Sequence, residues 1–130
     1  MESRLAHEDM PLFVYGTLCF EEVLRALLRR VPYSEPAALA GWRAAALARR
    51  PYPGLVPAPG GLARGRLLRG LTPEECAVLD AFEGAEYTMR AVAVDGGRAA
   101  RTYVWRGGDV LAEDWDAERY AERVIAAYGR

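Results

Sequence analysis

The spacing of apolar residues predicts three helices. Between Glu21 and Arg30, four apolar residues recur at helical spacing, with acidic residues in the first turn and arginines in the last, as the helix dipole favours. A second helix is predicted from Thr72 to about Glu83, because Thr72, Pro73 and Glu75 form a capping-box start and Gly84 is a stop signal. The third runs from about 116 to 128, with an apolar stripe on one face.

Several other segments have the composition of β-strands. Pro11–Tyr15 is β-branched and aromatic and ends at Gly16, which predicts a strand that feeds a tight turn. The segment 37–48 is rich in alanine but lies between two proline-bearing stretches, and we interpret it as a strand. The segment 50–61 contains four prolines and is predicted to be a loop with one brief strand, whereas 62–71 is predicted to be a strand.

A β-hairpin is predicted near the C-terminal end of the chain. The β-rich runs 87–94 and 101–105 flank Asp95-Gly96-Gly97, a strong turn signal. Helices and strands are interleaved without the regular alternation of a doubly wound sheet, which predicts an α+β fold with a small barrel or curled sheet flanked by helices. We expect one domain over 10–130 and a flexible tail over 1–9.

Composition and charge exclude several classes of function. The net charge is −1, so the chain lacks the global positive field that draws proteins to nucleic acid. It contains no run of eighteen apolar residues and no secretory signal, so neither a membrane partner nor export is expected. Cys19 and Cys76 are interpreted as small hydrophobic residues rather than a disulfide, which fits a reducing cytoplasm.

The residues available for chemistry are few. The sole histidine, His7, lies in the expected tail, which argues against Ser-His and Cys-His catalysis and against a zinc site. No phosphate-binding glycine motif is present, so neither a metal nor a cofactor is expected. Carboxylate chemistry remains, and Glu83 lies at helical spacing from Cys76 and Leu79 on the predicted core-facing side. A partly buried glutamate there could exchange protons near neutral pH.

Both candidate features also have ordinary interpretations. From periodicity alone, Glu83 is more simply a solvent-facing residue at a helix end. The turn Tyr15-Gly16-Thr17-Leu18 can turn backbone amides outward, as an oxyanion or carboxylate site requires, but a plain β-turn explains a lone Gly-Thr step equally well.

Five segments together resemble the γ-glutamylcyclotransferase-like family, and in particular its branch with plant avirulence-induced proteins and γ-glutamylamine cyclotransferases. The segments are FVYGTL at 13–18, YPGLVP at 52–57, LTPEECAVLDAFEG at 71–84, EYTMRAVAV at 86–94 and TYVW at 102–105. They follow the family's order from Pro11 to Tyr128.

The resemblance implies a small mixed β-barrel with flanking helices and a small-molecule γ-glutamyl substrate. It assigns the substrate loop to Tyr15, Gly16, Thr17 and Leu18, and the catalytic acid/base to Glu83, which would release 5-oxoproline and an amine without a cofactor. Many relatives have serine where this chain has Thr17, a difference that bears on substrate preference.

Three further residues are weaker candidates near the site. Tyr87 and Arg90 follow the Glu83 helix and are candidates to orient Glu83 or to anchor a substrate carboxylate, and Tyr52 is a candidate for the cavity rim. Alternative functions are a non-catalytic metabolite-binding module, an enzyme that removes a γ-glutamyl protecting group in biosynthesis, and a purely structural interaction protein.

Overall fold

The computed structural model describes residues 10–129, so the tail expected over 1–9 lies outside the described residues. The elements in chain order are β1 (Leu12–Val14), the 3-10 helix η1 (Thr17–Cys19), α1 (Glu21–Leu28), β2 (Ser34–Leu47), β3 (Gly54–Leu68), α2 (Pro73–Glu83), β4 (Tyr87–Val94), β5 (Arg98–Trp105), β6 (Val110–Asp114) and α3 (Ala117–Tyr128).

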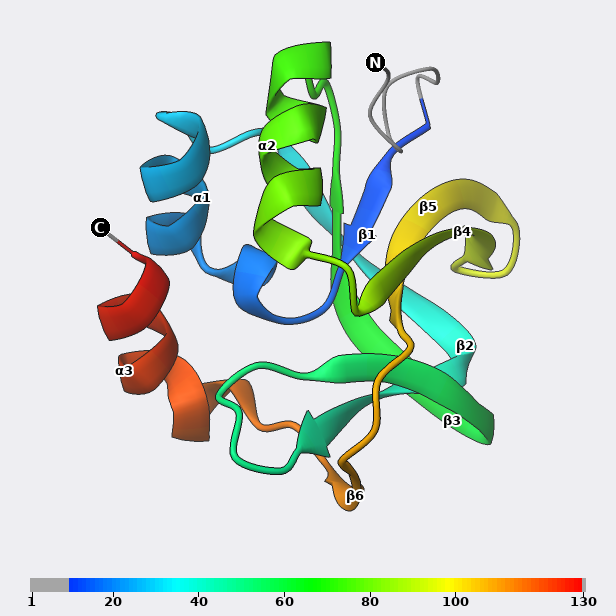
Figure 1. The fold of residues 1–130 in the computed structure, drawn as a ribbon. Helices are drawn as coiled ribbons and strands as arrows, with labels where there is room; N and C mark the ends of the chain where they lie inside the picture. Colours follow the sequence, from blue (N-terminus) through cyan, green and yellow to red (C-terminus); the bar gives the residue numbers. More distant parts are fainter. Residues whose placement is uncertain (1–9, 130) are drawn as a thin grey trace.

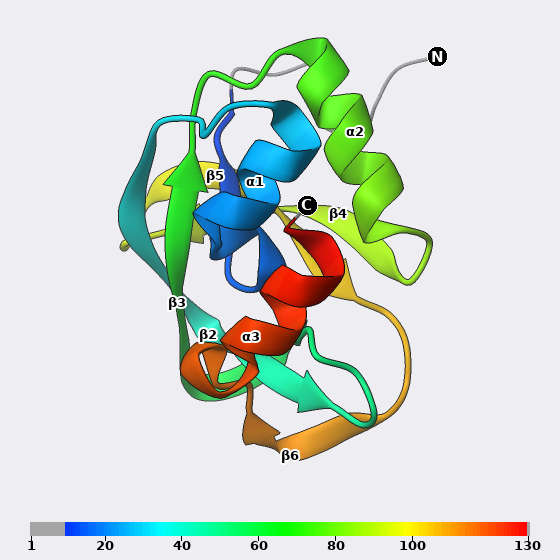
Figure 2. The same ribbon diagram turned by 90° about the vertical axis from the view of Figure 1, so that its left-hand side faces the viewer.

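Six strands form one curled sheet in the order β4-β5-β1-β3-β2-β6. The β1–β5 pair is parallel, and the other pairs are antiparallel. Helices α1, α2 and α3 lie together along one side of the sheet, as Figure 1 and the rotated view in Figure 2 show. This half-barrel confirms the prediction of an α+β fold with a curled sheet and flanking helices.

The tip of the β4–β5 hairpin holds the curl in place. Asp95 N–H donates to Ala38 O, and Ala38 N–H donates to Asp95 Oδ1, both at 2.9 Å. These bonds connect an end of the β4–β5 hairpin to β2, which lies on the other side of β1 and β3 in the strand order. The predicted hairpin is confirmed, and β5 begins three residues before the predicted start.

Strand β1 separates two hydrophobic clusters. Leu12 and Val14 pack with the helices, whereas Phe13 and Tyr15 pack inside the curl, as the two-residue period of a strand requires. All three residues of β1 are buried. The turn after β1 is therefore held at the centre of the molecule.

Helix α2 has the start that the sequence predicts. Thr72 Oγ1 accepts from Glu75 N–H at 3.1 Å, and Glu75 Oε1 accepts from Thr72 N–H at 3.0 Å. Arg30 donates to both carboxylate oxygens of Glu75 at 2.7 Å, which joins α2 to the end of α1. The helix ends at Gly84, whose φ of 85° suits glycine.

The prediction of a loop over 50–61 is wrong from Gly54 onward. Strand β3 runs without interruption from Gly54 to Leu68. Its pairing with β1 covers Arg66–Leu68, so Pro57 and Pro59 lie outside that contact. The pairing with β2 also shifts register between Ala40 and Trp42. Prolines are tolerated where a strand has a free side or a bulge.

Strand β6 has no counterpart among the predicted elements. Its residues, Val-Leu-Ala-Glu-Asp, are mostly exposed and do not alternate between apolar and polar side chains. The Arg43 guanidinium secures the strand to β2 by donating to the carbonyl oxygens of Leu111 at 2.7 Å and of Ala112 and Glu113 at 3.2 Å.

Cys19 and Cys76 are free thiols, half-buried and buried respectively. Within residues 10–129, no helix combines the length and apolar character needed to cross a bilayer. In the same range, no three His, Cys, Asp or Glu side chains gather closely enough to hold a metal ion.

Candidate functional site

A narrow inner cavity lies where β1 ends and α2 ends. Its volume is about 20 Å³. The four residues of the predicted substrate loop, Glu83 and Tyr87 all line it, whereas Tyr52 and Arg90 do not. The lining consists of Phe13, Val14, Tyr15, Gly16, Thr17, Leu18, Pro53, Glu83, Tyr87 and Tyr103.

The turn after β1 contributes backbone to this cavity. Within η1, Cys19 N–H donates to Gly16 O at 2.9 Å. The amides of Thr17 and Leu18 precede this bond and have no acceptor inside the short helix. A Cβ at Gly16 would lie 2.5 Å from Pro53 Cγ, so the close approach of the Pro53 ring requires glycine here.

Glu83 is the last residue of α2 and lines the same cavity as the turn. Leu79 and Cys76, one and two turns earlier, are buried on the same helix face. The helix therefore brings a carboxylate to the edge of the core, as the spacing predicted. The catalytic role of Glu83 remains a prediction.

Two buried tyrosines fix the walls of the cavity. Tyr15 OH donates to Tyr103 O at 2.6 Å, and Tyr87 OH donates to Pro53 O at 2.8 Å. Burial raises the pKa of both phenols well above the ordinary value, and the charge of Glu83 raises each further. Both hydroxyls therefore stay protonated at neutral pH and do not serve as bases.

Sequence reasoning missed Tyr103, which connects the sheet to α2. Its hydroxyl donates to Asp80 Oδ1 at 2.5 Å, one turn before Glu83 on the same helix. Tyr103 lies on β5 and lines the cavity. Tyr103 belongs to the TYVW segment, but its place in the site depends on the pairing of β5 beside β1, which that local segment does not predict.

A wider outer cavity adjoins the inner one. Its volume is about 140 Å³. Thr17, Glu83 and Tyr87 line both cavities. The remaining lining residues are the half-buried aromatic side chains of Tyr52, Phe82 and Tyr128.

Aromatic contacts hold these three side chains in place. The rings of Phe82 and Tyr128 meet edge to face at 5.3 Å, and Tyr52 packs edge to face against Trp105 at 6.5 Å. Tyr52 therefore lines the cavity as expected. Phe82 and Tyr128 were missed, although Tyr128 belongs to the apolar stripe of α3.

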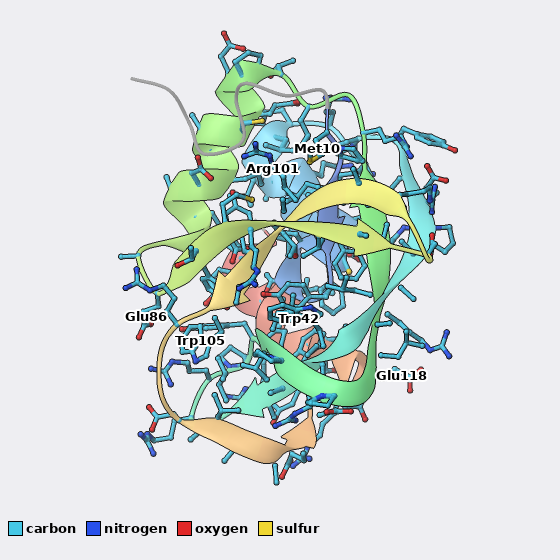
Figure 3. All side chains as sticks on the ribbon, turned by 90° about the vertical axis from the view of Figure 1, so that its right-hand side faces the viewer. Met10, Trp42, Glu86, Arg101, Trp105 and Glu118 are labelled. Carbon is cyan, nitrogen blue, oxygen red and sulfur yellow. The ribbon has the colours of Figure 1, made fainter. Side chains whose placement is uncertain are left out.

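Trp105 in turn anchors a small charged cluster. Arg50 lies over the Trp105 ring at 5.3 Å and donates to Asp109 Oδ2 at 3.1 Å. Its guanidinium is also 3.9 Å from Glu86 Oε2. Figure 3 labels Glu86 and Trp105 at this edge of the molecule. Tyr52 therefore packs against the same tryptophan that Arg50 covers.

The structure places Arg90 away from both cavities. Its guanidinium lies over the Trp42 ring, 5.5 Å from the ring centre, and the side chain is exposed on β4. Figure 3 shows Trp42 at the curved part of β2 and β3. The hypothesis that Arg90 orients Glu83 or anchors a substrate is therefore wrong for this arrangement.

The half-barrel and its paired cavities define a class of small α+β protein in which a glycine turn faces a glutamate at a helix end. The chain belongs to the family described as gamma-glutamyl cyclotransferase, AIG2-like, whose model matches residues 12–120. The resemblance seen in the sequence motifs is thereby confirmed.

Individual relatives agree with this membership. The chain is 37% identical over 118 residues to AIG2-like protein C of Arabidopsis thaliana, covering 85% of this chain and 69% of that protein. A solution structure of an Arabidopsis thaliana protein has 31% identity and a TM-score of 0.71, covering 92% of this chain and 87% of that one.

A structure named gamma-glutamyl cyclotransferase has the same fold. Its TM-score is 0.63 at 14% identity, covering 94% of this chain and 81% of that one. At this identity the likeness concerns the fold alone.

Proposed function

We propose that this protein is a γ-glutamyl cyclotransferase, which converts a γ-glutamyl amide into 5-oxoproline and a free amine. One observation carries the proposal: the carboxylate-bearing end of α2 and the Gly16 turn face a common cavity whose tyrosines are held neutral. Membership of the family supports the same reaction class.

The substrate supplies its own nucleophile. The α-nitrogen and the γ-carbonyl carbon are the two ends of a five-atom segment, so folding the substrate closes a five-membered ring and replaces an encounter between two molecules. A new C–N bond forms between the α-nitrogen and the γ-carbonyl carbon, and the bond from that carbon to the leaving nitrogen breaks. This chemistry requires neither metal nor cofactor.

Glu83 moves the protons in this scheme. It takes one proton from the α-ammonium before attack and returns it to the leaving nitrogen as the tetrahedral intermediate collapses. The ring nitrogen loses a second proton to solvent, and the released amine takes up one from solvent. The charges and protons therefore balance.

The Gly16 turn holds the other end of the substrate. Amides of Thr17 and Leu18 are proposed to bind the α-carboxylate and to stabilise charge that develops during ring closure. The inner cavity of about 20 Å³ has room for little more than one water-sized group, because a single water needs about 10–15 Å³. The free thiols of Cys19 and Cys76 support the further proposal of a reducing cytoplasm.

The test is 5-oxoproline release with wild type, Glu83→Gln and the control Glu74→Gln. Glutamine is nearly isosteric with glutamate but cannot exchange a proton at neutral pH, so kcat/KM should fall by about 10²–10⁴-fold. Glu74 is exposed on the same helix, and its variant should match wild type.

Circular dichroism and thermal melting show whether each variant is folded, so that a loss of activity can be distinguished from a loss of folding. A folded Glu83→Gln variant with full activity would contradict the assigned role. Folded wild-type protein that releases no 5-oxoproline from any γ-glutamyl amide would contradict the proposed function and favour a metabolite-binding module.

A further inference from the structure

A third cavity lies between α1 and the strands β2 and β3, and we call it the α1 cavity. Its volume is about 300 Å³, which is the size of a small-molecule site. Figure 2 shows α1 beside β3 and the chain that passes from α1 to β2. Among the described lining residues, the α1 cavity shares Leu18 with the inner cavity and none with the outer cavity. It is therefore a separate site from the one that contains Glu83.

One part of the α1 cavity is apolar. Leu18, Leu24 and Leu68 line it and are buried, and Val31 lines it and is half-buried. Leu18 belongs to η1, Leu24 to α1 and Leu68 to β3. A hydrocarbon group placed against these side chains loses contact with water, which favours its binding.

Arg66 brings a fixed positive charge to the same cavity. Its backbone is held on β3, which pairs with Val14 of β1 on one side and with Pro36 of β2 on the other. Its guanidinium donates from Nε to Ser34 Oγ at 2.7 Å and from Nη2 to Ser34 O at 3.3 Å. A guanidinium has five N–H donors, so Nη1 and the second N–H of Nη2 are available to a ligand.

The charge of Arg66 has no ion-pair partner within residues 10–129. Other arginines of the sheet differ in this respect, since Arg43 pairs with Asp114 and Arg69 pairs with Glu35. A half-buried guanidinium without a carboxylate retains most of its capacity to bind an anion.

Two other side chains of the α1 cavity could supply negative charge. Burial raises the pKa of the Cys19 thiol to about 12, although the charge of Arg66 opposes that shift, so the thiol is neutral at pH 7. Glu21 lines the cavity, but its side chain is 71% exposed and its Oε1 lies 4.0 Å from Nη2 of Arg25. The carboxylate of Glu21 disfavours a ligand with two negative charges more than a ligand with one.

We propose that the α1 cavity is a second ligand site, which binds a small monocarboxylate with an apolar body. The carboxylate accepts from the Arg66 guanidinium and from the hydroxyl of Ser34, whose oxygen already accepts from Arg66. The hydrocarbon body packs against Leu18, Leu24 and Leu68. This proposal does not depend on the cyclotransferase reaction, because no residue of the proposed chemistry takes part.

Three probes that share one apolar body test the charge preference. They are 4-phenylbutanoate, 4-phenylbutanamide and 4-phenylbutyl phosphate, titrated into wild-type protein at pH 7 by calorimetry and by amide chemical shifts in NMR. We expect the carboxylate to bind at least about tenfold more tightly than the amide, because a hydrogen bond to a charged group is stronger than one between neutral groups. It should also bind more tightly than the phosphate. The largest shifts should occur at Cys19, Ser34 and Leu68.

A matched pair of variants tests the role of Arg66. Arg66→Gln removes the charge and should reduce the preference for carboxylate over amide to less than about twofold. Arg64→Gln is the control, because Arg64 is exposed two residues away on β3 and does not line the cavity, and its preference should be that of wild type. Thermal melting shows whether both variants are folded.

Several results would overturn the assignment. They are equal affinity of wild type for carboxylate and amide, tighter binding of the phosphate, no binding of the carboxylate at millimolar concentration, and shifts centred on Glu83 and Tyr128. A folded Arg66→Gln variant that keeps the preference would overturn it too. The titrations of wild type decide the question even if Arg66→Gln does not fold, since the charge preference and the position of the shifts need no variant.

Discussion

Replacing Gly16 with alanine places a methyl group against the proline ring at the wall of the inner cavity. The added Cβ lies 2.5 Å from Pro53 Cγ and 2.7 Å from Pro53 Cδ, whereas nonbonded carbons pack at about 3.5–4.0 Å. The ring cannot rotate away because it is bonded to its own backbone. Either the turn or Pro53 must shift by about 1 Å.

The shift has a cost in stability and a larger one in activity. Overpacking costs about 1–3 kcal/mol, and alanine restricts the unfolded chain by about 0.4–1 kcal/mol, which leaves a net loss of about 1–2 kcal/mol. With an unfolding entropy of about 2.1 cal/mol/K per residue over 130 residues, Tm should fall by about 4–7 °C. Pro53 O accepts from Tyr87 OH, so the site is distorted and kcat/KM should fall on the order of 10²-fold.

Gly97→Ala is the matched control, because a Cβ there meets nothing within 4 Å. Its free energy of unfolding should change by less than about 0.5 kcal/mol, and its activity should be that of wild type. Urea titration and 5-oxoproline release at 25 °C are measured on both variants. If Gly16→Ala matched Gly97→Ala in midpoint and turnover, the close-approach explanation would be refuted.

Other contacts give further predictions. Thr72→Ala removes the capping-box acceptor and should lower the free energy of unfolding by about 1 kcal/mol in urea titration; Thr72→Ser, which keeps the hydroxyl, should not. Hydrogen bonds from Arg98 lower the pKa of Asp95. The stabilisation by ionised Asp95 is therefore fully present above the ordinary pKa of aspartate and is lost as the pH falls through the lower pKa of the folded protein. Tm should therefore decrease as the pH drops below about 4, and it should decrease less steeply for Asp95→Asn. Equal slopes of Tm against pH in wild type and variant would contradict this. Burial raises the pKa of Cys19 to about 12, so iodoacetamide at pH 8 should spare the native thiol and label urea-unfolded protein in mass spectra. Rapid native labelling would count against that burial.

Local signals were enough to predict α2 and the residues near its end. Thr72, Pro73 and Glu75 determine the helix start within four residues, and Gly84 determines its end. The Asp95-Gly96-Gly97 turn is equally local, because it joins two adjacent strands. Such features were predicted because their stabilising contacts lie within one or two turns of chain.

Features that depend on distant partners were not predictable in the same way. Pro57 and Pro59 argue locally against a strand, and only the position of β3 relative to β1 and β2 accommodates them. Likewise, Phe82 and Tyr128 meet at 5.3 Å across 46 positions of sequence. The segments 13–18 and 71–84 indicated residues of the inner cavity. The outer cavity, in contrast, is completed by Tyr128 and therefore forms only when α3 packs against the rest of the protein.

The position of β1 has a consequence for how the protein is made. This strand is synthesised early, yet it pairs with Arg66–Leu68 on one side and with Arg101 and Thr102 on the other. When the nascent chain has emerged only as far as α2, β1 can pair with β3 but not yet with β5. One edge of β1 is therefore open and available to pair with other chains. Pairing on both sides of β1 must wait until β5 has emerged, so this protein completes its centre late in translation.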